Sequence, residues 1–166
     1  MGRIHRLIST CLGIGYIPKG GGTVAAGVCC VAWYFAWRGG NEHFWLPLVL
    51  TAGLLFLGIY SAGKVEAEWG TDSYRVVIDE VVGMGITLLF VPVRWPYLLI
   101  GLLLFRFFDI VKPLYIRKME NLDGGWGVMM DDVLAGVYSC IVLQAVVYLF
   151  MRYHHELVNS CLFRGI

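Results

Sequence analysis

Long apolar segments alternate with short polar segments along this chain of 166 residues. The apolar segments lack the regular polar positions of an amphipathic surface helix, and their lengths suit helices that cross or nearly cross a membrane. Five such segments can be delimited, at residues 23–37, 45–62, 78–91, 97–111 and 132–151. The pattern predicts an all-α fold: a polytopic membrane helical bundle of about five transmembrane or near-spanning helices, with residues 1–166 in a single domain.

Polar or Gly- and Pro-rich segments separate these predicted helices. Residues 38–41 and 92–96 are typical of short turns, whereas residues 64–77 and 112–130 predict longer loops. Several apolar segments are shorter than the roughly 20 residues that span an average bilayer. We therefore expect local thinning of the membrane, polar caps at membrane depth, or helices that extend past their apolar residues.

The two ends of the chain are less apolar than its middle. Residues 1–17 carry Arg3, His5 and Arg6 ahead of a weakly apolar stretch and lack the apolar core of a secretory signal. We expect this segment to be retained and to lie along the membrane surface. Residues 153–166 predict a C-terminal tail.

The composition agrees with the apolar pattern. Hydrophobic residues make up 58% of the chain and charged residues 15%, against about 25% charged residues in soluble proteins, and the mean hydropathy is +0.70. The formal net charge of +1 argues against nucleic acid as a partner, because such binding normally requires a basic face. The five cysteines show no Cys-x-x-Cys spacing, so neither a disulfide framework nor a zinc site is predicted. These features leave the oligomeric state open.

Five crossings would place the loops before residue 23, at 64–77 and at 112–130 on one side of the membrane. Nine of the thirteen Lys and Arg residues fall on this side: Arg3, Arg6, Lys19, Lys64, Arg75, Arg106, Lys112, Arg117 and Lys118. The positive-inside tendency therefore predicts that this side is cytoplasmic, with the N terminus inside. Ten of the twelve acidic residues, all except Glu42 and Glu156, share this side. Because negative charges do not set orientation, their gathering predicts an active site at the cytoplasmic face.

A glycine-rich segment, Pro18-Lys19-Gly20-Gly21-Gly22-Thr23, opens the first apolar segment. Three successive glycines allow a nest of backbone N–H groups that can meet a phosphate at a helix N terminus, with Lys19 and Thr23 as further donors. The alternative is a flexible loop that Thr23 caps. The candidate phosphate-binding residues in this segment are Lys19, Gly22 and Thr23.

Two pairs of adjacent carboxylates stand where apolar segments begin. Asp79 and Glu80 open the third segment, and Asp131 and Asp132 open the fifth. Carboxylates that enter an apolar segment are costly to desolvate, so protons, basic partners or a metal must neutralise them. Helix capping is the simpler alternative, because acids favour a helix N terminus, but one acid would satisfy that role.

Charged residues of both signs stand at the end of the fourth segment. Arg106, Asp109 and Lys112 follow one another in steps of three and so share one stripe of a helix, which Pro113 then ends. An ion pair of Arg106 and Asp109 that merely neutralises itself is the alternative to a functional role. Otherwise Arg106 and Lys112 can offset the charge of a bound phosphate.

Five carboxylates are thus expected at three helix ends on one face: Asp79, Glu80, Asp109, Asp131 and Asp132. With no His or Cys among them, this all-oxygen set suits a hard cation, chiefly Mg²⁺, which often bridges protein carboxylates to a substrate phosphate. The chain has no Cys-x5-Arg loop and no His close to these acids. Phosphomonoester hydrolysis would therefore use a metal-activated water, or a carboxylate as nucleophile or base, so all five are candidate catalytic and metal-binding residues.

Three blocks of this sequence resemble the phosphatidylglycerophosphatase A family: VIDEVVGMGITL from Val77, FRFFDIVKP from Phe105 and GGWGVMMDDVLAGV from Gly124. The resemblance, which extends from about Tyr16 to Tyr138, implies a bacterial inner-membrane enzyme. Such an enzyme removes the terminal phosphate of phosphatidylglycerophosphate in a Mg²⁺-dependent reaction that gives phosphatidylglycerol. The resemblance also implies that the same five carboxylates are the acidic site residues, with Arg106 and Lys112 as the basic ones.

Two positions depart from the family's pattern. Where the family has a PGT-x-GS segment, this chain has Pro18 followed by Lys19 and three glycines, and Tyr115 stands where a second proline often follows Pro113. The alternative functions are a phosphatase for another lipid phosphate, a small cation transporter and, ranked below hydrolysis, a phosphotransferase, whose D-x2-D-G-x2-A-R spacing is absent. A transporter would hold its acids at mid-bilayer rather than at helix ends.

Overall fold

A computed structural model describes residues 2–40, 45–70 and 73–163, with side chains up to residue 154. Every regular element of this part is helical: α1 (Gly2–Ser9), η1 (Ile14–Tyr16), α2 (Gly21–Trp37), α3 (Leu46–Trp69), α4 (Ile78–Leu88), α5 (Trp95–Val111), α6 (Ile116–Met119) and α7 (Gly125–Phe163). The all-α prediction is therefore confirmed. Met1, Asn41, Glu42, Asp72, Arg164 and the side chain of Glu156, which entered the sequence predictions, lie outside the described part.

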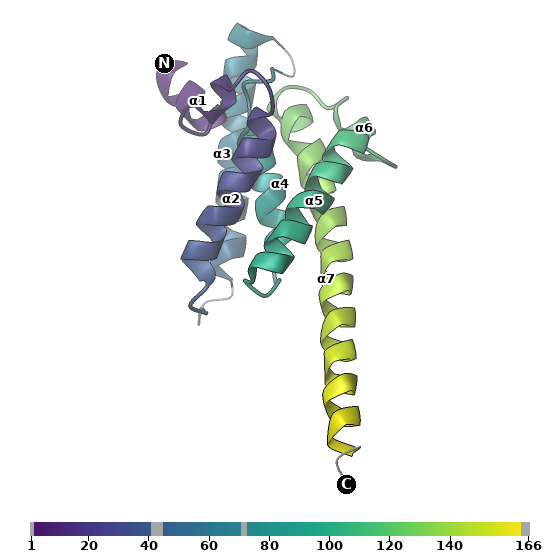
Figure 1. Cartoon of the computed structure of the whole chain (residues 1–166). Coiled ribbons are helices and arrows are strands. Elements are labelled where there is room, and N and C mark those ends of the chain that lie inside the picture. Colours follow the sequence, from purple (N-terminus) through teal and green to yellow (C-terminus); the bar gives the residue numbers. More distant parts are fainter. Residues whose placement is uncertain (1, 41–44, 71–72, 164–166) are drawn as a thin grey trace.

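The five longer helices run in alternating directions and form one bundle (Figure 1). α1 and α6 lie at the end of the bundle where the N terminus is found, and the connections before α2, between α3 and α4, and between α5 and α7 lie at this same end. We call it the amino-terminal end. α4 occupies the centre of the bundle, because it packs on α2, α3, α5 and α7. Its side chains Val82, Met84 and Leu88 are buried in the core.

Glycines bring α4 and α7 unusually close together. A Cβ atom built on Gly136 of α7 would lie 2.4 Å from the carbonyl oxygen of Gly83 in α4, and one built on Gly83 would lie 2.5 Å from the ring of Phe105 in α5. No side chain fits at such distances, so the two backbones approach as small residues allow in membrane helix pairs. This contact holds the first turn of α4 beside the second turn of α7.

α3 is longer at its C-terminal end than the hydropathy indicated. The sequence predicted a helical segment ending at residue 62 and a polar loop over 64–77, but α3 continues to Trp69. Hydropathy reports the part of a helix that suits hydrocarbon, whereas the helix continues while its backbone hydrogen bonds can form, and Lys64, Glu66 and Glu68 are good helix formers.

α7 begins earlier and ends later than predicted. The predicted segment was 132–151, but the helix runs from Gly125 to Phe163, so its first turns replace the end of the predicted 112–130 loop and its last turns lie in the predicted tail. At about 1.5 Å per residue, α7 is far longer than a bilayer core is thick, and its C-terminal part projects beyond the other helices (Figure 1).

Within the described residues, two helical stretches are long and apolar enough to cross a membrane, namely α3 and residues 125–154 of α7. α2 is apolar but has only 17 residues, and α4 has 11. The prediction of about five spanning or near-spanning helices therefore stays a prediction for the shorter members of the bundle.

α1 is fixed to the C-terminal part of α3. Arg6 donates two hydrogen bonds to Glu68, at 2.6 and 2.9 Å, and His5 lies 3.3 Å from the hydroxyl of Ser61. The apolar side chains Ile4 and Leu7 of α1 remain exposed, as expected for an amphipathic helix at a membrane surface.

Candidate active site

A cavity of about 260 Å³ opens at the amino-terminal end of the bundle. It lies where the N-terminal turn of α2, the first turn of α4, the last turn of α5 and the second turn of α7 meet. All five carboxylates that the sequence singled out line it: Asp79, Glu80, Asp109, Asp131 and Asp132. The chain reversals thus bring together acids from three helices.

Three of these carboxylates are close enough to share one ion. Asp79, Glu80 and Asp132 each offer an oxygen atom that lies within 4.8 Å of the other two. Asp132 is almost fully buried, at 3% exposure. Negative charges at this spacing in a buried site repel one another strongly, so the cluster favours a bound cation or proton.

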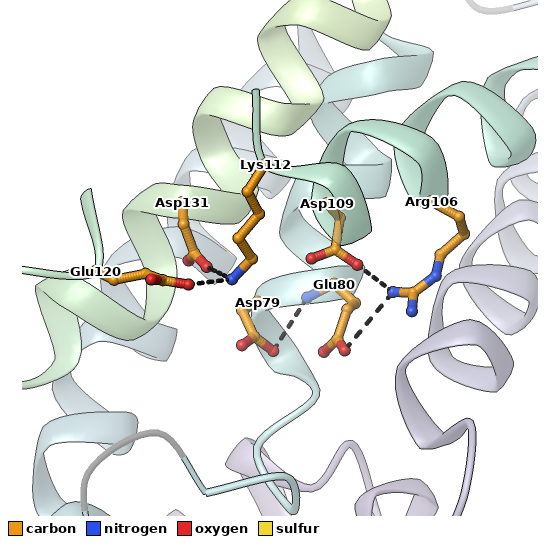
Figure 2. A network of polar contacts seen from close by, with 7 residues as sticks. All are labelled: Asp79, Glu80, Arg106, Asp109, Lys112, Glu120 and Asp131. Atoms are coloured by element: carbon orange, nitrogen blue, oxygen red, sulfur yellow. Dashed lines mark hydrogen bonds and ion pairs between the residues drawn. The ribbon is translucent and has the colours of Figure 1, made fainter. Parts of the chain in front are cut away.

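The first turn of α4 carries both members of the first acid pair, as predicted. Val77 is the N-cap residue and makes no side-chain capping bond, and the Asp79 carboxylate accepts the backbone N–H of Glu80 at 3.1 Å (Figure 2). The capping alternative therefore holds in part for Asp79, since first-turn N–H groups have no partner within the helix.

The second acid pair lies in the second turn of α7. The prediction that Asp131 and Asp132 stand at a helix start is wrong, because α7 begins at Gly125. The Gly-rich stretch that was predicted as a loop forms the first turns of this helix instead. Macrodipole stabilisation at a helix N terminus falls off within the first turn, so capping does not account for this pair.

Arg106 links two of the carboxylates. It donates a hydrogen bond to Asp109, one turn further along α5, and its Nη1 also lies 3.9 Å from Oε1 of Glu80 (Figure 2). The predicted Arg–Asp pair is thus present, but it is not isolated. Nε of Arg106 is buried without a hydrogen-bond partner among the described residues, so it leaves a donor available beside the cavity.

Lys112 departs from the predicted helical stripe. It is the C-cap residue of α5 with φ 46° and ψ 53°, so it turns away from Arg106 and Asp109. Its ammonium group donates to Asp131 at 2.7 Å and to Glu120 at 2.6 Å (Figure 2). Partial burial acts to lower the pKa of Lys112, but the hydrogen bonds and charges of these two carboxylates outweigh it and raise the pKa above the usual lysine range.

The glycine-rich segment reaches the cavity through its glycines. Gly20, with φ 80°, is the N-cap residue of α2 and carries no side-chain cap, so the alternative in which Thr23 caps the helix is wrong. Gly20 and Gly22 line the cavity. Lys19 and Thr23 are exposed and are not among its lining residues, so their phosphate-binding role stays a prediction.

Gly22 has a more specific role than nest formation. A Cβ atom at this position would lie 1.8 Å from Oε1 of Glu80, a distance that no side chain can occupy. Because Gly22 has no side chain, α2 leaves a space at this position, and the Glu80 carboxylate lies in it.

Several cavity residues could not be found from the sequence. Ser73, Tyr74 and Val76, which precede α4, line the cavity, and Glu120 shares Lys112 with Asp131. No spacing marks Glu120, because it follows α6 in a polar connection where Asp123 could equally have faced Lys112.

Two carboxylate oxygens at the site lack an internal partner. Oε2 of Glu80 and Oδ1 of Asp131 are buried, and neither accepts a hydrogen bond from any described residue. Buried carboxylate oxygens normally have partners, so a group from outside the chain would complete the arrangement.

Comparison with known proteins agrees with this geometry. The family model described as phosphatidylglycerophosphatase A matches residues 7–147 of the chain. This chain belongs to the phosphatidylglycerophosphatase A family. All the carboxylates and basic residues of the cavity fall within the matched region.

Three curated relatives extend this finding. A Bacteroides thetaiotaomicron protein named "Putative phosphatidylinositol-3-phosphatase" is 48% identical over 143 residues, covering 82% of this chain and 89% of the relative. Phosphatidylglycerophosphatase A of Haemophilus influenzae is 44% identical over 104 residues, covering 61% and 64%. Phosphatidylglycerophosphatase A of Escherichia coli is 32% identical over 145 residues, covering 82% and 80%. No solved structure matches this chain.

Membership of the phosphatidylglycerophosphatase A family supports a lipid phosphatase activity for this chain, with a lipid phosphate as substrate. Together with the two long apolar helices, it also indicates a membrane protein.

Proposed function

We propose that this protein hydrolyses the terminal phosphomonoester of phosphatidylglycerophosphate, giving phosphatidylglycerol, in a Mg²⁺-dependent reaction at the cytoplasmic face of the bacterial inner membrane. One observation carries the proposal. Oxygens of Asp79, Glu80 and Asp132 lie within 4.8 Å of one another in a cavity that Arg106 and Lys112 also line. Carboxylates for a metal and cations for a phosphate are thus combined in one place.

The donor set fits Mg²⁺. Magnesium binds oxygen ligands at about 2.0–2.1 Å, so two oxygens on opposite sides of one ion lie about 4.1 Å apart. Small side-chain rotations would bring the three carboxylates of the cluster from within 4.8 Å to this spacing. The buried, unpartnered Oε2 of Glu80 is a further available donor atom, and the cavity leaves room for the waters that magnesium usually keeps. Asp79, Glu80 and Asp132 would therefore hold the ion.

Asp109 and Asp131 have a different part in this proposal, although both were predicted as metal ligands. Each lines the cavity but is bonded to a cation, Asp109 to Arg106 and Asp131 to Lys112. These bonds orient the two basic side chains toward the cavity. Asp131 keeps its unpartnered Oδ1, with which it can accept a proton or a water.

The basic residues would bind the substrate phosphate, which carries about two negative charges at neutral pH. Arg106 offers the unpartnered Nε–H, and Lys112 remains protonated because its carboxylate partners raise its pKa. A bound Mg²⁺ would supply Lewis-acid stabilisation of the charge that develops on the phosphoryl oxygens and lower the pKa of a bound water. Positioning and charge stabilisation account for most of the catalysis in phosphoryl transfer.

The attacking group follows from the side chains present. Among the described residues no His or Cys lines the cavity, whereas the hydroxyl-bearing Ser73 and Tyr74 do. In the proposed reaction water attacks phosphorus while a carboxylate accepts its proton, or a carboxylate attacks first and water then releases the phosphate. In either route the bond between phosphorus and the lipid oxygen breaks. In the first route the carboxylate passes the proton that it took from water to the departing alcohol; in the second the alcohol takes a proton from solvent, and water then splits the acyl phosphate into carboxylate and free phosphate.

The distribution of Lys and Arg supports the cytoplasmic location. Nine of the thirteen lie toward the predicted inside, which is the end of the bundle that holds the cavity. The clustering of the acids at one end also favours an enzyme over a cation transporter, whose acids would follow a path through the membrane.

A second candidate substrate is the phosphomonoester of a phosphoinositide. The observation that favours it is the 48% identity to the relative named for phosphatidylinositol-3-phosphatase activity. Both substrates carry a phosphomonoester on a lipid headgroup, so the same carboxylates and cations would serve, and the difference lies in the alcohol that leaves.

Release of free phosphate from purified protein tests both proposals. The substrates are phosphatidylglycerophosphate, phosphatidylinositol 3-phosphate and phosphatidic acid in detergent micelles, each with Mg²⁺ and with EDTA. We expect Mg²⁺-dependent release that is fastest from phosphatidylglycerophosphate. Faster release from the phosphoinositide would favour the second candidate, equal rates with EDTA would remove the metal from the proposal, and no release from any of the three would reject the hydrolase function.

A further inference from the structure

An apolar groove runs along the opposite side of α4 from the acid cavity. It has a volume of about 600 Å³. Its floor is α4, its walls are α2 and α3, and side chains of α1 close it at the amino-terminal end. The groove exists because α2 and α3 each pack on α4 but make few contacts with one another. Figure 1 shows α1 lying across the amino-terminal end of α2 and α3.

Apart from the indole N–H groups of Trp33 and Trp37 near its far end, the groove offers a ligand no side-chain hydrogen-bonding group that is not already bonded. Among its few polar residues, the hydroxyl of Thr51 donates to the carbonyl of Pro47 at 2.8 Å, the thiol of Cys29 to Val81, and the thiol of Cys11 to Val77. The remaining lining residues are aliphatic or aromatic apart from Gly85. A polar ligand would lose its bonds to water here without compensation, so the chemistry of the groove selects hydrocarbon.

The groove and the acid cavity share their structural elements. In the first turn of α4, Asp79 and Glu80 line the cavity while Ile78 and Val81 line the groove. In α2, the N-terminal glycines line the cavity, and Ala25, one turn later, lines the groove. A lipid with its phosphate among the carboxylates would therefore have the start of the groove about one helical turn away, on the opposite side of α4.

The length of the groove fits one lipid chain. Along α2 the lining residues run from Ala25 to Trp37, a rise of about 18 Å at 1.5 Å per residue. One leaflet of hydrocarbon is about 15 Å deep, half of the roughly 30 Å core of a bilayer. Trp33 and Trp37, with Pro47, close the far end.

We propose that this groove binds one acyl chain of the lipid phosphate whose phosphate group occupies the acid cavity. The inference rests on the proposed function for the identity of that lipid. One wall of the groove is α3, which is long and apolar enough to cross the membrane, so a chain can enter sideways from the bilayer. The groove then holds the lipid at a fixed depth and aligns its phosphate with the carboxylates.

A ring introduced into the groove tests this proposal. Ala32 lines the groove, whereas the adjacent Val31 is 45% exposed and lies outside it. Ala32→Phe and Val31→Phe thus add the same ring to the same helix at the same depth. Ala36→Phe fills the groove nearer its far end, at Trp37, and replaces Ala32→Phe if that variant fails to fold.

The measurement is kcat/KM for phosphate release from dioleoyl phosphatidylglycerophosphate, divided by kcat/KM for its deacylated headgroup. We expect Ala32→Phe to lower this quotient roughly tenfold, because the ring displaces at least two methylenes and each buried methylene is worth about a factor of four. Val31→Phe should leave the quotient unchanged. An unchanged quotient in Ala32→Phe, or an equal fall in Val31→Phe, would overturn the inference.

Photolabelling separates this inference from the proposed function, because it does not require turnover. The probe is phosphatidylglycerophosphate with a diazirine in the middle of one acyl chain, and labelled peptides are mapped by mass spectrometry. We expect label on the α2 and α3 residues of the groove, reduced in Ala32→Phe but not in Val31→Phe. Label in the groove without phosphate release would support the acyl-chain site and reject the proposed hydrolysis. Normal phosphate release with label elsewhere would reject the acyl-chain site, and so would a second copy of the chain that occupies the groove.

Discussion

The two acid pairs of this protein look alike in sequence but differ in the structure. Asp79-Glu80 and Asp131-Asp132 are both followed by a valine and by glycine within a few residues. Both members of the first pair belong to the close carboxylate cluster. Of the second pair only Asp132 does, whereas Asp131 is bonded to Lys112.

The position of each pair in its helix explains this difference. Neighbouring residues of an α-helix point about 100° apart, so two adjacent short side chains cannot both face one point from the second turn of α7. The first pair faces the cavity from the first turn of α4, where Glu80 has a longer side chain and Gly22 makes room for it. Adjacent acids therefore do not imply adjacent roles.

The largest expected effect that separates the two pairs is that of Asp132→Asn. The change keeps the shape but removes one charge from the cluster, and the loss of a metal ligand costs several kcal/mol of transition-state stabilisation, which corresponds to a loss of roughly a thousandfold in phosphate release. The control is Asp123→Asn, an exposed acid outside the cavity. Wild-type turnover in Asp132→Asn would contradict the metal role.

The same variant also separates function from folding. With EDTA present the three carboxylates repel one another, so Asp132→Asn should raise the midpoint of thermal unfolding in detergent or leave it unchanged. A lower midpoint would indicate that Asp132 supports the fold instead.

A smaller effect is expected for Asp131→Asn. Because Asp131 is bonded to Lys112 and lies outside the close carboxylate cluster, its replacement should lower kcat about 10- to 100-fold, as for residues that orient metal ligands or substrate-binding groups, with little change in the half-saturating Mg²⁺ concentration. Addition of Lys112→Met should then cost less than it does alone, since the two side chains act as a pair. Additive losses would show that they act separately.

Gly22→Ala tests the space that the first pair requires. The new Cβ would lie 1.8 Å from Glu80, so the carboxylate must shift, and we expect roughly a tenfold rise in the half-saturating Mg²⁺ concentration, within the range seen when ligand orientation is disturbed. Gly27→Ala in the same helix is the matched control, because nothing lies within 4 Å of its Cβ position. Equal half-saturating Mg²⁺ concentrations for the two variants would show that Gly22 does not position the Glu80 carboxylate for the metal.

The smallest expected effect is that of Glu120→Gln. Glu120 is partly exposed, with a side-chain exposure of 40%, and such ion pairs contribute little, so phosphate release should fall less than about threefold. The pKa of Lys112 should fall toward its usual value but stay high, because the Asp131 carboxylate still stabilises the charged ammonium group. The rate should therefore stay level from pH 7 to 9; a new decline there would assign Glu120 a larger part.

The sequence predicted the composition of the cavity better than its internal bonds. Hydropathy and chain reversals placed five carboxylates and two cations at one end of the bundle, and the cavity contains all of them. Hydropathy could not indicate that α7 starts at Gly125, because backbone hydrogen bonds, not apolar side chains, decide where a helix begins. It could not indicate Glu120 either, since a polar connection has no period that fixes the direction of a side chain.

The apolar segments and the reversals between them determined, from the sequence alone, that acids distant along the chain would meet at one face, because successive helices of a bundle must run in opposite directions. Only the tertiary structure decided which three carboxylates meet and which two pair with Arg106 and Lys112. That choice depends on how closely α4 approaches α7 at Gly83 and Gly136 and on the turn at Lys112. Both are set by packing between helices, which residue spacing within a single helix does not encode.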